Sequence, residues 1–285
     1  MSIEPAVGML AAGFFPVWYP MVPFSSRFSF ALKVSALHLL GSLVVTCCAS
    51  LLVFYFWFPF PYGELGGGWK LFWILIGVDV VCGPLLTLVL FSPTKPRTEL
   101  RHDFALIMAV QLSALLYGLH TLSQARPLAL VYEVDRFRAV SMSDLDEKDL
   151  AASPNWLRPW SLAAPRLVGL RTGHDAAELL KSIDLAAAGL QAGQRPSLWQ
   201  DYALNVSQVL ERSHPLSELR AKHPNQTALL DHALTQARRD AKAGDHPKPE
   251  TLRWLPLVSR KVMDWVVLID PVTARVRGYV HLDGF

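Results

Sequence analysis

The stretch that decides the fold is Val78-Asp79-Val80-Val81-Cys82-Gly83-Pro84-Leu85-Leu86-Thr87, near the centre of an apolar segment, residues 71–91. That segment is long enough to cross a bilayer as a helix. A charged carboxylate at mid-membrane costs roughly 2.5–3.5 kcal/mol on insertion scales, so Asp79 needs a partner or a proton. Pro84 removes a backbone donor and bends a helix, and Gly83 lets a neighbouring helix come close. We therefore expect this helix to contact another one.

Two more apolar runs complete a set of three predicted membrane spans. The first, residues 34–58, ends in an aromatic cluster, and the third, residues 104–121, carries Gln111 at its middle. Runs of this length with interfacial aromatic residues are typical of transmembrane helices. The lipid bilayer is thus a predicted partner.

The cations flanking these runs predict an orientation. Arg27 and Lys33 precede the first run, residues 95–101 carry three more cations, and the connection between the first two runs contains Lys70 alone. The positive-inside rule then places the N-terminus and residues 95–101 inside and everything after residue 126 outside. In a bacterium, this means an inner-membrane protein with a cytoplasmic N-terminus and a periplasmic C-terminal domain.

The part after the third run has the composition of a water-soluble domain. Strand-like runs at residues 128–140 and 166–171, helical periodicity at 175–189 and 225–243, and a closing strand hairpin around 264–280 predict an α+β domain with a small antiparallel sheet. We divide the chain into a membrane part of three helices, residues 27–124, and a periplasmic part, residues 125–285. Residues 1–26 are interpreted as a disordered or interfacial extension, or as the product of a start assigned too far upstream.

Composition and motifs exclude several function classes. The net charge of +3 is small and its cations are scattered, so nucleic acid is not an expected partner. The sequence has no glycine-rich phosphate loop and no G-x-S-x-G nucleophile motif, and the following histidines lack metal-ligand spacing: His174, His214, His223 and His246. We therefore expect a protein that is not an enzyme and needs no cofactor or metal.

A group of short motifs resembles one known family. These are Tyr62-Gly63, the stretch 78–87, Lys95, Asp103, Gln111, Tyr117-Gly118, Arg126-Pro127, Asp135-Arg136-Phe137, Trp254-Leu255-Pro256-Leu257 and Gly278-Tyr279-Val280. From about Phe28 onward the chain is similar to the type IV pilin accessory proteins of the TfpX/TfpZ type. The resemblance implies an inner-membrane accessory protein or chaperone, without known catalytic chemistry, that assists assembly of a type IV major pilin.

Asp79 has two main interpretations. In the first, it makes a structural hydrogen bond inside the bundle, for example to Gln111 or to hydroxyl groups of the first span. In the second, Asp79 and Gln111 form a polar patch on which the N-terminal helix of a pilin docks, with the bend at Gly83 and Pro84 providing the groove. The resemblance implies an acidic residue and a free amino terminus in that helix. A proton relay is a third, less supported interpretation.

The loop with Trp156, Arg158 and Trp160, flanked by prolines, is the aromatic segment that we offer as a second pilin-facing surface. The alternative function is a membrane-anchored periplasmic sensing or binding module. A pilin-assembly role predicts that pilin is retained by the protein, whereas a sensing module makes no such prediction.

Overall fold

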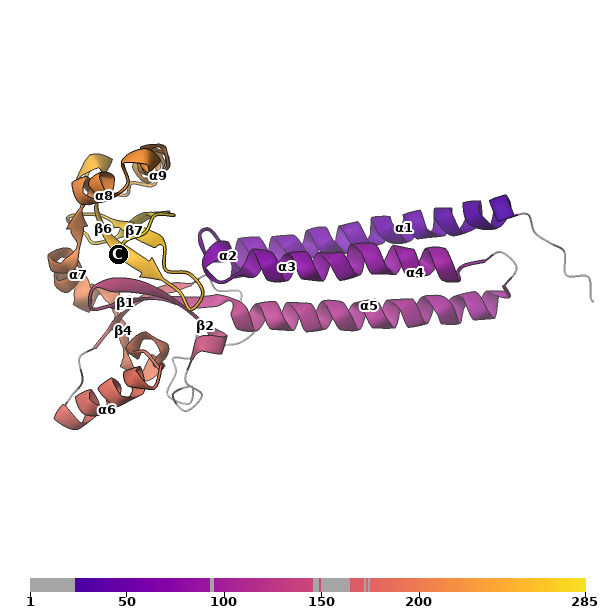
Figure 1. The fold of residues 1–285 in the computed structure, drawn as a ribbon, viewed down its shortest axis with the longest axis horizontal. Helices are drawn as coiled ribbons and strands as arrows, with labels where there is room; N and C mark the ends of the chain where they lie inside the picture. The colour runs from indigo at the N-terminus through magenta and orange to yellow at the C-terminus, as the bar shows by residue number, and fades with distance from the viewer. Residues whose placement is uncertain (1–23, 93–94, 146–148, 150–164, 172, 174) are drawn as a thin grey trace, which may run out of the picture.

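The computed structural model describes residues 24–92, 95–145, 149, 165–171, 173 and 175–285 (Figure 1). The predicted surface at Trp156, Arg158 and Trp160 lies outside the described residues, as does nearly all of the predicted N-terminal extension. A long bundle of apolar helices carries an α/β domain at one end (Figure 1).

Among the described residues, three helical segments are long and apolar enough to cross a membrane, as the hydropathy pattern predicts: Phe28–Trp57, Gly68–Leu90 and Arg97–Ala125. In the first segment α1 (Phe24–Leu51) runs into a π-helix, η1 (Leu52–Trp57). The second is composed of α3 (Gly68–Ile76), a π-helix η2 (Gly77–Cys82) and α4 (Gly83–Leu90). The third is a single helix, α5 (Arg97–Ala125).

The π-helix η2 ends at Cys82, two residues before Pro84. A proline ring inside an α-helix clashes with the carbonyl group four residues earlier and supplies no N–H to the helix. A wider π-turn is one of the ways in which a helix relieves such a conflict. The expected break at Gly83 and Pro84 is therefore a local change of helix type, and Asp79 lies within it.

The second span packs between the other two because small residues allow a close approach. Helix α1 contacts both α4 and η2, and its buried residues include the small side chains of Ala31, Ser35 and Ser42. A Cβ atom on Gly83 would lie 2.0 Å from the amide nitrogen of Gln111 on α5. Small residues at such crossings let helix backbones meet in the membrane, where dispersion and hydrogen bonds drive association.

The connection between the first two spans is part of the core of the α/β domain. It forms a short helix, α2 (Tyr62–Leu65), whose Tyr62 and Leu65 side chains pack in one cluster with Tyr132, Phe137 and Trp265. Burial raises the pKa of Tyr62, and its hydroxyl lies 3.4 Å from that of Tyr279. The membrane part and the domain therefore share a core.

The loop between β6 and β7 also binds this connection, through hydrogen bonds from its side chains to backbone carbonyl groups of the connection. The hydroxyl of Ser259 donates to the carbonyl oxygen of Leu65 at 2.7 Å. The ammonium group of Lys261 donates to the carbonyl oxygen of Gly66 at 3.1 Å. These bonds satisfy carbonyl groups at the end of α2 that the helix itself leaves without donors.

The α/β domain contains an 8-stranded mixed sheet of order β4-β3-β1-β2-β6-β7-β8, with β5 also paired to β6. Its strands are β1 (Pro127–Glu133), β2 (Arg136–Ser141), β3 (Arg166–Leu170), β4 (Trp199–Asp201), β5 (His214–Pro215), β6 (Arg253–Val258), β7 (Trp265–Ile269) and β8 (Val276–Val280). The α+β class is confirmed, and β7 and β8 form the expected closing hairpin.

The sheet is larger than the small antiparallel one that we expected, and two of its pairings are parallel. β1 pairs with β3, and β2 with β6, in parallel. Parallel neighbours need a long crossover between them, and both β3 and β6 come back to the sheet after long connections. Alternation along a strand indicates which face is buried but does not indicate which distant strand lies beside it.

Helices and short 3₁₀-helices complete the domain. The α-helices are α6 (Ala176–Ala187), α7 (Val206–Arg212), α8 (Leu216–Lys222) and α9 (Thr227–Arg239). The 3₁₀-helices in the described part of the domain are η3 (Met142–Asp144), η5 (Ala192–Gln194), η6 (Pro196–Leu198), η7 (Tyr202–Asn205), η8 (Pro224–Gln226) and η9 (Pro249–Thr251). Helix α9 packs its apolar side, including Leu230 and Leu234, with Trp254 and Leu268 of the sheet.

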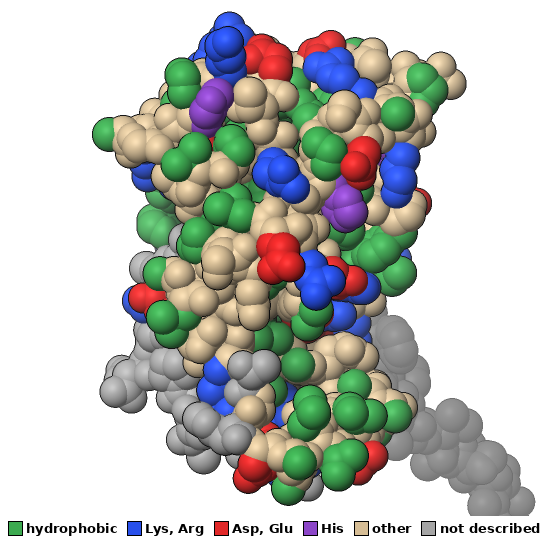
Figure 2. All heavy atoms as spheres, turned by 90° about the vertical axis from the view of Figure 1, so that its left-hand side faces the viewer, with side chains coloured by type: hydrophobic (Ala, Val, Ile, Leu, Met, Phe, Trp, Pro, Cys, Tyr) green, Lys and Arg blue, Asp and Glu red, His purple; other side chains and the backbone are tan. Residues whose placement is uncertain are grey.

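Helix α6 is amphipathic, as its periodicity predicts, but its apolar stripe points outward. Leu179, Leu180 and Ile183 are each more than half exposed. On the other side Glu178 pairs with Arg171, and Ser182 accepts a hydrogen bond from Arg195. Hydrophobic side chains gather at the lower end of the face turned away from the helical bundle, where α6 lies (Figure 2).

We predict that Leu65→Ala destabilises the whole protein although Leu65 lies between two membrane spans. Leu65 is 1% exposed and packs in the core of the domain, so its truncation leaves a cavity there. The expected loss is about 2–5 kcal/mol. Thermal unfolding of the detergent-solubilised full chain, followed by tryptophan fluorescence, measures it. Leu204→Ala is the matched control because Leu204, in the same domain, is 68% exposed. Equal melting temperatures for the two variants would contradict the shared core.

A second prediction concerns the close approach of the second and third spans. Gly83→Ala pushes Gln111 out of its position, which leaves a buried amide without its partners at a cost of about 1–3 kcal/mol. Gly77→Ala is the control in the same span, since a Cβ atom there meets nothing within 4 Å. Both variants are compared by thermal unfolding in detergent, and only Gly83→Ala is expected to melt earlier. A stable Gly83→Ala protein would show that the helices do not cross as closely as described.

Candidate functional site

Polar side chains from all three spans meet at one place in the bundle. Ser35 and His38 come from α1, Asp79 from η2, Thr87 from α4 and Gln111 from α5. Polar groups in an apolar environment are costly unless they are hydrogen-bonded, and polar residues inside a membrane commonly mark a functional site. The cluster, which we call the polar centre, is therefore the candidate site.

His38 joins the other two spans. Its Nδ1 lies 2.6 Å from Oγ1 of Thr87, and its Nε2 lies 2.7 Å from Oε1 of Gln111. An amide oxygen can only accept, so Nε2 of His38 donates to Gln111. The Thr87 hydroxyl also lies 3.0 Å from the carbonyl oxygen of Gly83, and its single proton can serve only one of these two neighbours. The imidazole ring thus bridges α4 and α5.

Gln111 compensates for the donor that Pro84 lacks. In a π-turn the carbonyl group of residue 79 would accept from the N–H of residue 84, which proline does not have. Nε2 of Gln111 donates to this carbonyl oxygen of Asp79 at 3.0 Å. Next to it, the hydroxyl of Ser35 donates to the carbonyl oxygen of Pro84 at 2.7 Å. Side chains of both neighbouring spans therefore donate hydrogen bonds to the backbone of the second, and the bond from Gln111 replaces the one that Pro84 does not supply.

The carboxyl group of Asp79 remains apart from these bonds. The residue is 6% exposed, and its Oδ1 has no hydrogen-bond partner within the part of the chain that the structure describes. The structure thus brings Asp79, Gly83 and Gln111 together, but Gln111 binds the backbone of Asp79 and not its carboxylate. A buried carboxyl oxygen without a partner can take a proton or accept from an incoming donor.

An apolar groove of about 350 Å³ lies between α1 and α5, beside the polar centre. His38 and Gln111 are the residues of the polar centre that line it. The complete lining is Val34, Leu37, His38, Gly41, Ser42, Val45, Phe104, Met108, Gln111, Leu112 and Leu115. Several of these, including Leu37 and Leu112, are exposed, so the groove opens on the outer surface of the bundle.

The position of the groove differs from the one that we inferred from the sequence. Gly83 and Pro84 are buried against the neighbouring spans and do not line the groove. Of the predicted site residues, Gln111 lines the groove, whereas Asp79 lies deeper in the bundle, behind Gln111. His38 and Thr87 were not predicted; the signal for His38 is its place between Ser35 and Ser42, which puts three polar side chains on one face of a helix.

Metal binding finds no support among the described residues, where no three His, Cys, Asp or Glu side chains gather closely enough to hold an ion. What the candidate site offers is donors, acceptors and one carboxyl group in an apolar setting. Such an arrangement can bind a polar group carried by another helix.

Comparison with known proteins places the chain in a family. A sequence model described as "Fimbrial assembly protein FimB" matches residues 26–67. The "Fimbrial assembly protein, serogroup I" of Dichelobacter nodosus is 34% identical over 259 residues, which cover 91% of this chain and 98% of that protein. The serogroup E1 protein of the same organism is 35% identical over 260 residues, with the same coverage of 91% and 98%.

A third relative, described as "Fimbrial assembly protein, serogroups C1 and C2", is 46% identical over 119 residues, which cover 42% of this chain and 91% of the relative. No solved structure matches the chain significantly. Because the alignments with the first two relatives extend over nearly the full length of both chains, the chain belongs to the FimB family of fimbrial assembly proteins.

Proposed function

We propose that this protein is a non-enzymatic membrane accessory protein, of the TfpX/TfpZ type, that receives a type IV major pilin and assists its assembly into the pilus. The observation that carries the proposal is the groove between α1 and α5, with the polar side chains of His38 and Gln111 in its otherwise largely apolar lining. The fimbrial assembly role of the family makes a pilin the natural client.

The groove suits a helix as its occupant. An amphipathic or apolar helix binds a partner by laying one row of side chains into a groove. Gly41 and Ser42 are small residues at the groove wall, where they allow the backbone of a second helix to come close. Pilins are expected to store an apolar N-terminal helix in the membrane before assembly, and this helix is the proposed occupant.

The polar centre can determine the position at which the pilin helix binds along the groove. The pilin helix is expected to carry an acidic residue and a free amino terminus, both of which are expensive in lipid. Besides its bonds to His38 and Asp79, the amide of Gln111 keeps a second N–H and a second oxygen lone pair beside the groove, and the unpartnered Oδ1 of Asp79 lies behind it among the described residues. Pairing of these groups would fix how far the client helix slides along the groove.

We further propose the bacterial inner membrane as the location, with the α/β domain in the periplasm. The support is the distribution of cations: Lys95 and the neighbouring arginines follow the second span, and Lys95 pairs with Asp103 at 2.6 Å. A periplasmic domain would lie next to the head of a membrane-stored pilin.

Site-specific crosslinking in pilin-producing cells tests the proposed groove. A photoreactive amino acid in place of Val45, which lines the groove, is expected to yield a covalent adduct with the major pilin. The same amino acid in place of Val89 is the control, because Val89 is exposed on α4 and is not a groove residue. Immunoblotting of membranes for pilin detects the adduct. Equal adduct yields from the two positions, or none from Val45, would refute docking in this groove.

A groove-filling variant tests whether docking matters for assembly. Gly41→Phe places a ring in the groove, where a Cβ atom meets nothing within 4 Å, so the fold is retained. We expect the amount of assembled surface pilin to fall about ten-fold, which corresponds to 1.4 kcal/mol of lost binding. Gly77→Phe is the matched control, since Gly77 also has open space but lies outside the groove. Normal pili in the Gly41→Phe strain would contradict the proposal.

A further inference from the structure

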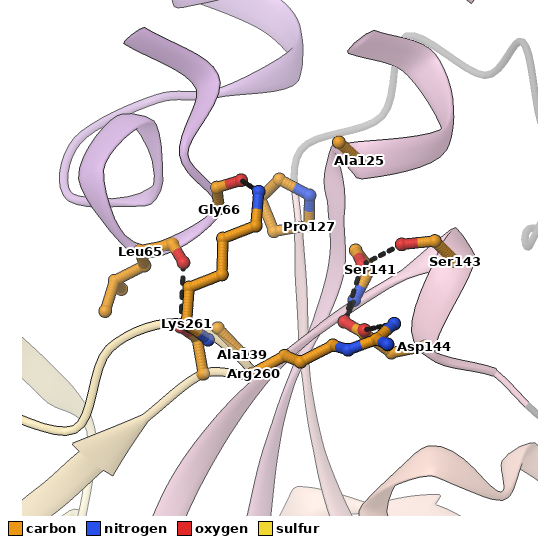
Figure 3. A pocket seen from close by; sticks show the side chains of 11 residues that line it. Leu65, Gly66, Ala125, Pro127, Ala139, Ser141, Ser143, Asp144, Arg260 and Lys261 are labelled. Carbon is orange, nitrogen blue, oxygen red and sulfur yellow. Dashed lines mark hydrogen bonds and ion pairs between the residues drawn. The ribbon is translucent and has the colours of Figure 1, made fainter. Parts of the chain in front are cut away.

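A second pocket, of about 210 Å³, lies where the third span enters the α/β domain (Figure 3). One wall contains Ala125, the last residue of α5, and Pro127, the first of β1. The complete lining is Leu65, Gly66, Ala125, Pro127, Ala139, Ser141, Ser143, Asp144, Ser259, Arg260 and Lys261.

Helix length places this pocket at the surface of a membrane. The 29 residues of α5 span roughly 43 Å at 1.5 Å per residue. The hydrocarbon core of a bilayer is only about 30 Å thick. The charged start of α5, Arg97 to Asp103, lies outside the hydrocarbon, and the remaining part, residues 104–125, spans about 33 Å. This places Ala125 at the opposite boundary of the hydrocarbon core, so the pocket beside it lies at the level of the lipid headgroups.

Two cations from consecutive residues frame the pocket. Lys261 reaches toward the membrane part, where its ammonium group donates to the carbonyl oxygen of Gly66 at 3.1 Å. Arg260 extends sideways from Lys261, toward Asp144 (Figure 3). Its side chain is 71% exposed, and its Nη1 lies 3.7 Å from Oδ1 of Asp144, which is too long for a hydrogen bond. Most of the donors of this guanidinium group face the pocket or solvent.

The carboxylate in the pocket is already engaged. Oδ2 of Asp144 accepts from the backbone N–H of Ser141 at 3.0 Å and from the hydroxyl of the same residue at 2.5 Å, in a capping box at the start of η3. The hydroxyl of Ser143 lies 3.0 Å from that of Ser141. The far wall thus presents hydroxyl groups, while Leu65, Ala125 and Pro127 give the membrane side an apolar lining.

We propose that this pocket binds the phosphate of an anionic phospholipid headgroup, of the phosphatidylglycerol class, on the side of the membrane where the α/β domain lies. Arg260 is the main phosphate contact, because a guanidinium group binds phosphate oxygens in a bidentate manner. Lys261 adds a second positive charge, and the hydroxyl groups of Ser141 and Ser143 lie where the glycerol of the headgroup would be. The acyl chains of the lipid would leave the pocket past Ala125 and Pro127. The inference rests on the membrane placement of the proposed function, and it does not depend on pilin as the client.

Such a lipid would strengthen the joint between the two parts of the protein. Ser259 and Lys261 hold the carbonyl groups of Leu65 and Gly66, and Arg260 lies between them in the sequence. A headgroup bound to Arg260 would restrain this loop and, through it, helix α2.

Thermal unfolding of the full chain, purified in detergent and depleted of lipid, tests the proposal. Short-chain phosphatidylglycerol is expected to raise the melting temperature saturably, whereas phosphatidylcholine of the same chain length and inorganic phosphate do so only weakly. Arg260→Gln should weaken the phosphatidylglycerol effect about five-fold, the contribution of one basic residue near an anionic surface. Arg260→Lys should retain part of it. Arg238→Gln is the control, because Arg238 is exposed on α9 and pairs with Glu250.

Each of the other results overturns the proposal. Equal shifts with phosphatidylcholine, or an unchanged response of Arg260→Gln, would exclude a headgroup site at Arg260. An equal shift with inorganic phosphate would assign the pocket to a free anion instead of a lipid. The pilin adduct from Val45 is measured separately, so its loss or retention distinguishes a failure of the proposed function from a failure of the lipid site.

Discussion

Pro84 offers no N–H to the carbonyl groups that precede it, and no water takes its place in the interior of a bilayer. The arrangement of the three spans follows from this deficit. Gln111 donates to the carbonyl oxygen of Asp79, Gly83 leaves the space that Gln111 needs, and His38 holds the other end of the amide. Ser35 donates to the carbonyl oxygen of Pro84 itself. The missing N–H of Pro84 thus accounts for the inward position of Gln111 on α5, and Ser35 of α1 contacts the same bend.

Hydropathy and periodicity predict much of this molecule. The lengths of three apolar runs predict the spans, Gly83 and Pro84 predict the change within the second span, and periodicity predicts α6 and α9. The nearness of Asp79 and Gln111 also follows from the sequence, since each lies near the middle of its span. These features depend on local composition or on depth in the membrane, and both can be read along one chain.

Features that depend on the rotation of a helix or on a distant partner are not predictable in this way. The lipid-facing and buried sides of α1 are both largely apolar, so hydropathy does not indicate that His38 points toward Gln111. In α6 the inward side is the polar one, held by Arg171 and Arg195, which reverses the usual rule for amphipathic helices. The parallel pairing of β2 with β6 likewise joins segments separated by more than 100 residues, with no local signal in either.

The place of Tyr62 and Leu65 in the core of the domain has a consequence for the biogenesis of the protein. Both residues precede β1 by about sixty positions and lie on the connection between the first two long helices. The core of the domain is therefore incomplete unless this connection reaches it. A copy whose hairpin fails to insert keeps a gap in that core and exposes apolar surface, the state that cellular proteases and chaperones remove. Folding of the domain thus depends on the placement of the helical hairpin that carries Tyr62 and Leu65.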